Sequence, residues 1–218
     1  MNPLKKKQAQ ELQFILEKIP AIKAANNIKI RNNIIENIVI KQQKLGKIVI
    51  QKLTIKDSKA LFNFYFQGLS EKSRFFFPPY PLFSPLPVSA NELSRKIKEW
   101  KKEKDWTVLK LIKNRKIIGI CLLKRYQTKK PTSGLAIREE FQKQGLGTIL
   151  QTVINEQCRL LNLNKLFIST AQNNFASQQM HKKCGFKKTG KLIPHFTYKN
   201  GKKIIDRYDI EMVKKIKK

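Results

Sequence analysis

The six residues from Gln142 to Gly147, with the sequence QKQGLG, have the types and spacing of a turn that binds phosphate. They follow an alternating apolar segment that contains Leu135 and Ile137, and they precede an apolar run with helical spacing. Glycine has no Cβ, so Gly145 and Gly147 would let a ligand approach the backbone. The first amides of a helix lack intrahelical partners, and together with the helix dipole they attract anions. The order of strand, glycine turn and helix therefore predicts a pyrophosphate site.

Two other phosphate-binding patterns do not fit this turn. A P-loop requires G-x-x-x-x-G-K-[ST], and the sequence contains no such run. A dinucleotide-binding fold requires G-x-G-x-x-G and an acidic residue about 20 positions later. Leu150 occupies the place of the third glycine, and no acidic residue has the required spacing. The turn is therefore expected to hold another class of pyrophosphate compound.

A second polar segment follows one helix and one strand further along the chain. It begins 27 residues after Gly147 and has the pattern N-x-x-S-x-x-M-H-x-x-x-G-F, formed by Asn174, Ser177, Met180, His181, Gly185 and Phe186. The two segments, in this order and at this spacing, resemble the main motifs of the GNAT superfamily of N-acetyltransferases. The resemblance covers about residues 46–218.

The resemblance implies an α+β fold. Its central sheet would be mixed and mostly antiparallel, with about six to seven strands and about four flanking helices. The sheet would splay between its fourth and fifth strands. Residues 46–218 would form this acetyltransferase domain, and residues 1–45 lie outside it as a basic N-terminal extension of unknown role.

The resemblance also implies an activity, in which an acetyl group moves from acetyl-CoA to an amine by direct attack within a ternary complex. Acetyl-CoA would be the donor substrate, and no metal is expected. The backbone near Leu135 and Ile137 would pair with the pantetheine arm as an added strand does. The expected pyrophosphate contacts come from Gln142, Lys143, Gln144, Gly145, Leu146, Gly147 and Thr148, and further coenzyme contacts from Asn174 and Ser177.

His181 stands where the family usually has a tyrosine that protonates the departing thiolate. Imidazolium is a stronger acid than tyrosine, with a reference pKa of about 6.5 against about 10. The position therefore predicts a general acid, and a surface histidine without a role is the alternative. Family members often place a glutamate early on the fourth strand as a base, but residues 131–134 read PTSG. Glu139 and Glu140 follow the strand and are expected to have structural or surface roles.

The remaining periodicities predict the elements that position these residues. Residues 5–19 have helical spacing, and residues 28–40 fit a strand or a helix equally well. Helix-start patterns occur at Thr54 and Ser89, and Asn173 or Asn174 is expected to cap the helix that Gly185 closes. The expected strands cover residues 48–53, 108–112, 117–123, 134–137, 166–170, 186–191, 196–198 and 204–213, with a hairpin turn at Asn200–Gly201 and a buried helical stripe from Leu146 to Leu161.

Two segments are candidates for the wall of the acceptor site. Residues 75–87 interleave aromatic residues with five prolines, which exclude a regular helix. Residues 194–202 precede the last strand and contain His195 and Tyr198. The acceptor amine would be a small molecule or a protein group, and neither the acceptor nor the oligomeric state follows from the sequence.

The composition admits two further functions. The net charge of +31 comes from 46 basic and 15 acidic residues, mostly lysine and spread along the chain. Such a charge is compatible with binding to RNA or the ribosome, although a solvated basic surface explains it as well. A third possibility is an acyl-CoA sensor without catalysis. The sequence has three cysteines without the spacing of a metal site, and it shows neither a signal peptide nor an apolar run of ~20 residues. These features predict a cytoplasmic protein with reduced thiols.

Overall fold

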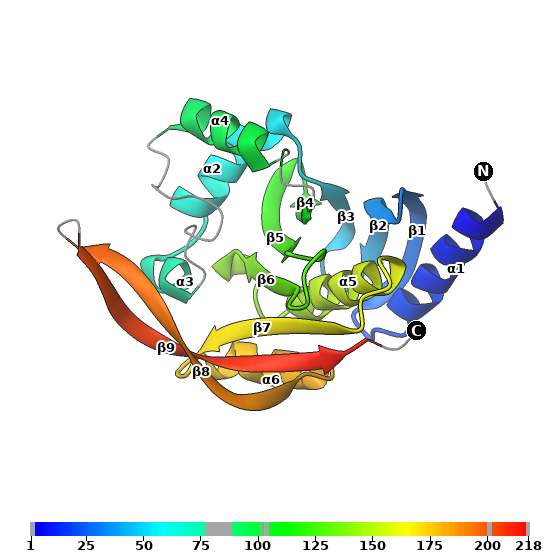
Figure 1. Cartoon of the computed structure of the whole chain (residues 1–218). Coiled ribbons are helices and arrows are strands. Elements are labelled where there is room, and N and C mark those ends of the chain that lie inside the picture. Colours follow the sequence, from blue (N-terminus) through cyan, green and yellow to red (C-terminus); the bar gives the residue numbers. More distant parts are fainter. Residues whose placement is uncertain (1–2, 77–88, 101, 103–104, 200–201, 217–218) are drawn as a thin grey trace.

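The structure is a computed structural model that describes residues 3–76, 89–100, 102, 105–199 and 202–216. Within these residues one sheet contains nine strands in the order β1-β2-β3-β4-β5-β6-β7-β9-β8 (Figure 1). Neighbouring strands are antiparallel, except that β6 and β7 are parallel. The strands are β1 (Ile22–Arg31), β2 (Ile34–Gln42), β3 (Gly46–Lys52), β4 (Trp106–Lys113), β5 (Lys116–Lys124), β6 (Thr132–Ile137), β7 (Lys165–Ala171), β8 (Lys187–Lys199) and β9 (Lys202–Lys215).

Helices pack on both faces of this sheet (Figure 1). Helices α1 and α5 contribute to a core on one face, and α2 and α4 contribute to a second core on the other. The described helices are α1 (Pro3–Glu17), α2 (Ser58–Phe66), α3 (Glu71–Phe76), α4 (Ala90–Trp100), α5 (Leu146–Leu160) and α6 (Phe175–Lys183), with 3-10 turns at η1 (Ile55–Asp57) and η2 (Glu139–Phe141).

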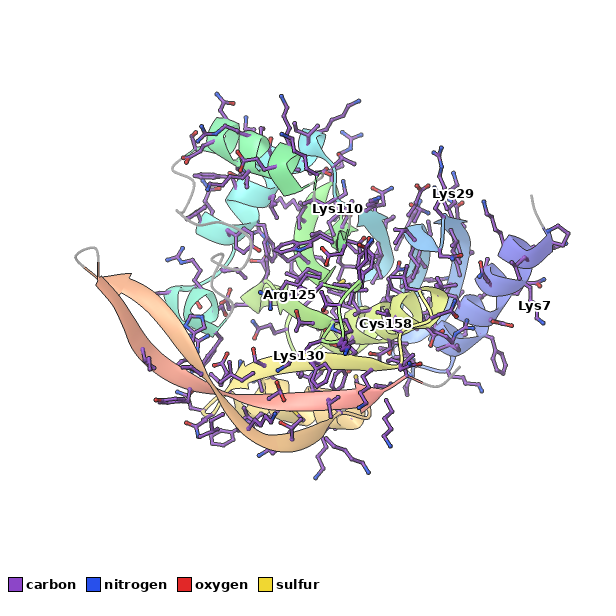
Figure 2. All side chains as sticks on the ribbon, viewed as in Figure 1. Lys7, Lys29, Lys110, Arg125, Lys130 and Cys158 are labelled. Atoms are coloured by element: carbon purple, nitrogen blue, oxygen red, sulfur yellow. The ribbon has the colours of Figure 1, made fainter. Side chains whose placement is uncertain are left out.

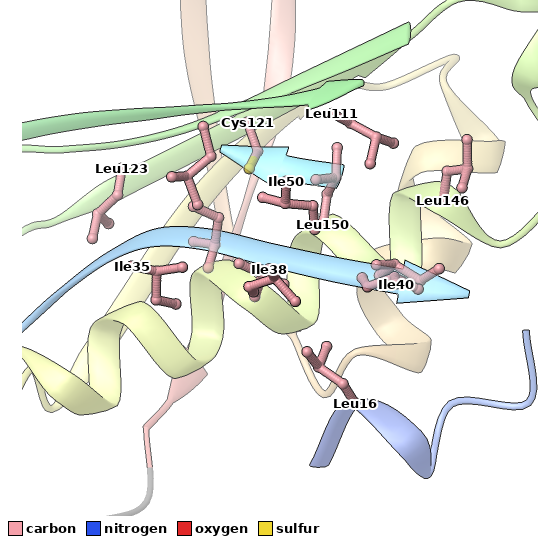
Figure 3. Packing of buried hydrophobic residues seen from close by; sticks show 14 of the residues in the cluster. Leu16, Ile35, Ile38, Ile40, Ile50, Leu111, Cys121, Leu123, Leu146 and Leu150 are labelled. Carbon is pink, nitrogen blue, oxygen red and sulfur yellow. The ribbon is translucent and has the colours of Figure 1, made fainter. Parts of the chain in front are cut away.

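The larger core lies between α5 and the first five strands. Figure 3 shows Ile38 of β2, Ile50 of β3 and Leu150 of α5 in this cluster, all of them fully buried. Each such side chain contributes about 1.5–3 kcal/mol relative to an exposed position. The alternation of strand β5 divides its residues between the two cores: Cys121 and Leu123 face α5, whereas Ile120 and Leu122 face α2 and α4. The central strands are therefore covered on both faces, and α5 is fixed against the sheet.

Strands β6 and β7 separate along their length. A single pair, Thr132 and Phe167, is in register between them. The Phe167 N–H also donates to the Pro131 carbonyl at 2.9 Å. On its other edge β6 pairs with β5 at every residue from Thr132 to Ile137. The edge of β6 that faces β7 is thus open beyond Thr132, at the place where the sequence predicts a splay.

Residues 3–42 join the sheet and its core. Strands β1 and β2 form a hairpin through Asn32 and Asn33, whose φ angles of 50° and 58° suit the tight turns of hairpins. This turn resolves the ambiguity of residues 28–40 in favour of strands. Strand β2 then pairs with β3. Leu12 and Leu16 of α1 are 1% and 0% exposed, so the predicted amphipathic helix packs on the domain.

The predicted numbers of strands and helices are too low. Residues 22–42 add two strands that the sequence did not specify. Helix α1, predicted outside the domain, packs on the sheet as a fifth helix, and α3 adds a sixth that was not predicted. Helix α3 also corrects the expectation of a loop from residue 75, because Ser70 accepts a hydrogen bond from the Ser73 N–H and starts a helix that extends to Phe76. The rest of the proline-rich segment, from residue 77, and the predicted turn at Asn200–Gly201 lie outside the described residues.

Candidate active site

A cavity of about 810 Å³ opens where β6 and β7 separate. Its wall consists of β6, the turn before α5, the end of β7, α6 and α3. The predicted site residues that line it are Leu135, Ile137, Gln142, Lys143, Gly145, Leu146, Gly147, Thr148, Asn174, Ser177 and His181. Gln144 is the one predicted residue that is not among the described lining residues; its side chain turns back and donates to the Glu140 carbonyl at 3.2 Å. The fold thus brings two distant motifs to one cavity.

The turn before α5 depends on left-handed backbone and on a glutamine. Gly145 has φ +80° at the N-terminus of α5, and Lys143 has φ +58°. Gly145 suits its position because glycine adopts this region without strain. The Gln142 side chain donates to the Ile137 carbonyl at 3.1 Å, which ties the turn to the end of β6. Gln142 therefore holds the shape of the turn as well as lining the cavity.

The two glycines of the turn differ in their surroundings. A Cβ on Gly145 would lie 3.0 Å from the Cβ of Ala21, so this residue is closed in by the N-terminal region. A Cβ on Gly147 would meet its nearest neighbour, Met180, at 3.7 Å, which is ordinary contact. The fold itself therefore tolerates alanine at Gly147.

Helix α6 presents the second motif to the cavity. Asn174 caps the helix through its Oδ1, which accepts from the Ser177 N–H at 3.2 Å. Gln178 anchors the preceding turn by donating to the Ala171 and Gln172 carbonyls at 3.2 and 2.8 Å. Gly185 has φ +87° just after the helix, as predicted for a helix C-terminus. These contacts fix the orientation of α6 at the mouth of the splay.

His181 is buried in the wall of this cavity, with 5% of its surface exposed. Its ring meets Phe186 edge-on at 5.4 Å, and its Nδ1 is buried without a hydrogen-bond partner among the described residues. Burial lowers the pKa of His181 from 6.5 to about 4 because the charged form loses its hydration. The imidazole is therefore neutral at pH 7, and its side chain lies in the cavity wall and not on the exposed face of the helix.

Glu139 links the turn to helix α3. Its Oε1 accepts from the Ser70 N–H at 3.0 Å and from the Ser70 hydroxyl at 2.6 Å. These hydrogen bonds lower the pKa of Glu139 despite the opposing effect of burial, so it is a carboxylate at neutral pH. Its partners agree with the structural role expected for it. Glu140 is an exposed partner of Arg138 at 3.9 Å.

Several lining residues were not anticipated from the sequence. They come from α3 and from the strands that border the gap: Ser70, Lys72, Ser73, Phe76, Ser133, Ser169 and Thr170. The Ser133 hydroxyl is buried without a hydrogen-bond partner in the described part of the chain. Ser70 followed by Glu71 is a helix-start signal that would have indicated α3. No local sequence pattern distinguishes the hydroxyl residues of β6 and β7 that face the gap between these strands from serine and threonine residues in other strands.

The predicted acceptor-side residues have mixed outcomes. His195 lies on β8 opposite Arg207 and is not among the described residues that line the cavity. The side chain of Tyr198 lies outside the described residues. Among the residues that the structure describes, no cluster of three or more His, Cys, Asp or Glu side chains has the arrangement of a metal site. None of the described helices has the length and apolar character required to cross a bilayer.

Comparison with solved structures agrees with this architecture. A GNAT-family acetyltransferase from Streptococcus pneumoniae superposes with a TM-score of 0.60 at 20% identity, covering 78% of this chain and 99% of that one. Spermidine N-acetyltransferase from Vibrio cholerae, in complex with CoA and spermine, gives 0.61 at 17% identity over 78% and 95%. Ribosomal-protein-S5-alanine acetyltransferase from Vibrio fischeri gives 0.62 at 16% identity over 78% and 93%.

Sequence comparison identifies the family. No curated protein gives a significant match to the chain. The family model described as the acetyltransferase (GNAT) domain matches residues 47–187, which include the glycine turn, the splayed strands and the whole second motif. With the cavity at the splay and two motifs on its wall, the chain belongs to the GNAT family of acetyltransferases.

Proposed function

We propose that this protein transfers the acetyl group of acetyl-CoA to an amine by direct attack in a ternary complex. The observation that carries this proposal is the cavity in which the open edge of β6 meets the N-terminus of α5. Pantetheine would pair with β6 near Leu135 and Ile137, and the pyrophosphate would sit against the first amides of α5. Backbone donors aimed at the thioester oxygen would stabilise the developing negative charge.

His181 would act on the leaving group. Because burial keeps the imidazole neutral, we propose that it donates an N–H hydrogen bond to the departing thiolate of CoA and keeps its own proton, and that the thiolate takes its proton from solvent. Glu139, the lining carboxylate, is engaged by Ser70, so we propose that the amine proton leaves through solvent at the neutral hydroxyls of Ser133 and Ser169.

The proposal also specifies the class of amine that accepts the acetyl group. Among the described residues that line the cavity, Lys72, Lys143 and Lys183 are basic and Glu139 is the one carboxylate. An excess of positive charge favours the phosphates of CoA and repels an acceptor with several ammonium groups. We therefore propose an acceptor with one amine, such as a protein N-terminus, a lysine side chain or an amino sugar, in preference to a polyamine.

A panel of acceptors tests this preference. Peptide N-termini, N-acetylated lysine peptides, glucosamine and spermidine would be compared at equal concentration by CoA release. We expect the highest kcat/KM for an acceptor with one amine, and for peptides a further increase when acidic residues follow the N-terminus. A preference for spermidine over all monoamines would refute the charge argument.

We propose the cytoplasm as the location, supported by three cysteines that form no disulfide.

Ligand-induced stabilisation tests the donor site without knowledge of the acceptor. Acetyl-CoA at 100 times its Kd should add about 2.7 kcal/mol to the free energy of unfolding. Gly147→Trp would fill the space that the ligand needs and should abolish this gain. Gly147→Ala should leave the free protein folded, because its Cβ meets Met180 only at 3.7 Å. A folded wild-type protein that gains no stability from acetyl-CoA would rule out both the enzyme and the acyl-CoA sensor.

The RNA-binding and sensor alternatives remain as outcomes of these measurements. Acetyl-CoA binding without turnover of any amine would favour the sensor. RNA affinity that falls steeply with salt, in a protein that does not bind acetyl-CoA, would favour the basic binding module.

A further inference from the structure

The N-terminal hairpin reaches the turn that is proposed to hold the pyrophosphate. Gln42, the last residue of β2, is 2% exposed. Its Nε2 donates to the Gln144 carbonyl at 3.0 Å, across 102 positions of sequence. Its Oε1 accepts from the Lys44 and Leu45 N–H groups at 2.8 and 2.6 Å. One buried amide thus closes the β2–β3 turn with its oxygen and fixes the α5 turn with its nitrogen.

The bonded carbonyl precedes the glycine that starts α5. A peptide group is planar and trans, so its N–H points opposite to its C=O. When Gln42 holds the Gln144 carbonyl, it also sets the direction of the Gly145 N–H, which points away from Gln42. Gly145 is itself in the left-handed region and lines the cavity. The side chain of Gln42 therefore determines the orientation of an amide at the phosphate end of the site.

Further contacts hold the same hairpin against α5. The Cβ position of Gly145 lies 3.0 Å from the Cβ of Ala21, whose carbonyl accepts from the Gln43 N–H at 3.0 Å. At the other end of α5, Gln157 accepts from the Ile35 N–H at 2.8 Å and donates to the Asn33 carbonyl at 2.6 Å. The hairpin thus contacts α5 at its two ends, and Gln42 is the contact at the phosphate end.

We propose that Gln42 is a positioning residue for coenzyme A binding, and that the α1–β1–β2 segment buttresses the pyrophosphate turn. This inference rests on the proposed acetyl-CoA site. A free turn would have to be ordered when the phosphates bind, and that ordering costs affinity. The hydrogen bond from Gln42 removes part of this cost in advance. The N-terminal extension thereby gains a role in the reaction although none of its residues needs to touch the coenzyme.

The test compares Gln42→Met, of similar length but without the amide, with Gln51→Met as a matched control. Gln51 belongs to the adjacent strand and donates to the Asn37 side chain at 3.0 Å, away from the α5 turn. One net hydrogen bond corresponds to about a threefold to tenfold change in an equilibrium constant. We expect the Kd for acetyl-CoA, measured calorimetrically, to rise by about this factor in Gln42→Met and to stay within about twofold of wild type in Gln51→Met.

Hydrogen exchange separates positioning from a general loss of stability. In Gln42→Met without ligand, the amides of residues 143–148 should exchange faster while those of β4 and β5 do not. Gln42→Asn, which keeps the amide on a shorter side chain, serves if Gln42→Met does not fold. A folded Gln42 variant with the wild-type Kd would refute this inference alone. A wild-type protein that does not bind acetyl-CoA would refute the proposed function instead.

Discussion

The chemistry available to His181 is set by its burial. The side chain lies in the cavity wall, with its ring against Phe186 and its Nδ1 unpartnered among the described residues. If it assists the departing thiolate, His181→Ala should lower kcat by about 100-fold under conditions in which the chemical step is rate-limiting. Lys182→Ala, an exposed change one residue away, is the control and should leave kcat unchanged. An unaltered rate in folded His181→Ala would show that a hydrogen bond from His181 does not assist the leaving group.

The same burial makes stability depend on pH. The folded pKa of His181 is about 4 and the reference value is 6.5, so the unfolded chain takes up the proton first as pH falls. Stability from this residue is therefore complete above about pH 6.5 and is lost toward pH 4. Between pH 7.5 and pH 5, wild type should lose about 2 kcal/mol more than His181→Gln in urea unfolding. Equal losses in both proteins would mean that the folded pKa is not lowered.

At the scale of elements, the start of α6 serves two functions that substitutions can separate. Asn174 caps the helix by accepting from the Ser177 N–H, and it also lines the cavity. Asn174→Ala should cost about 1 kcal/mol of stability and weaken acetyl-CoA binding. Asn174→Asp should retain the cap, since aspartate caps as well as asparagine, but its charge should oppose the phosphates. We expect an Asp variant of wild-type stability with about a fivefold higher Kd for acetyl-CoA.

Unfolding curves and binding isotherms for both Asn174 variants provide the measurement. Wild-type affinity in Asn174→Asp would show that Asn174 acts only as a helix cap. Asn91→Asp, at an exposed position in the first turn of α4, is the matched control for the added charge. It should leave the Kd for acetyl-CoA unchanged, because α4 packs on the other face of the sheet from α5, and any effect of its charge on stability should be a slight gain from the helix dipole.

At the scale of the whole molecule, the net charge of +31 acts in two directions. Basic side chains project from many elements; Lys7, Lys29 and Arg125 lie on α1, on β1 and after β5 (Figure 2). Their mutual repulsion destabilises the folded chain, and their field attracts anionic ligands. Raising NaCl from about 50 to about 500 mM shortens the Debye length to a few ångströms. We therefore expect the ligand-free protein to become more stable, by about 1 kcal/mol, while the Kd for acetyl-CoA rises.

Urea unfolding and calorimetric titration at the two salt concentrations would show these opposite trends. Repeating the unfolding with sodium glutamate in place of NaCl controls for specific chloride binding. A decrease of ligand-free stability with salt would contradict the repulsion argument. A Kd that does not change with salt would indicate that the phosphates are held by backbone amides alone.

Patterns that act over a few residues could be predicted from the sequence. Gly145 and Gly185 adopt the positive φ angles that their places at helix ends require, and Asn174 caps α6 as its spacing indicates. The continuous apolar run of β5, buried from Ile117 to Leu123, and the helical stripe of α5 were also visible in the sequence. These features depend on steric limits and hydrogen bonds between near neighbours, so the local sequence is sufficient to determine them.

The tertiary structure decided the features that join distant segments. Residues 28–40 fit two periodicities, and pairing of β1 with β2 and of β2 with β3 made most of them strands. His181 lies on a polar helix, and its low pKa comes from packing against Phe186 and the cavity wall, which no spacing reveals. Nothing in the sequence around Gln42 indicates a role for this strand residue, and only the fold places its side-chain amide beside the Gln144 carbonyl. The energies of these contacts depend on burial and on geometry between segments far apart in the chain, and only the folded molecule specifies both.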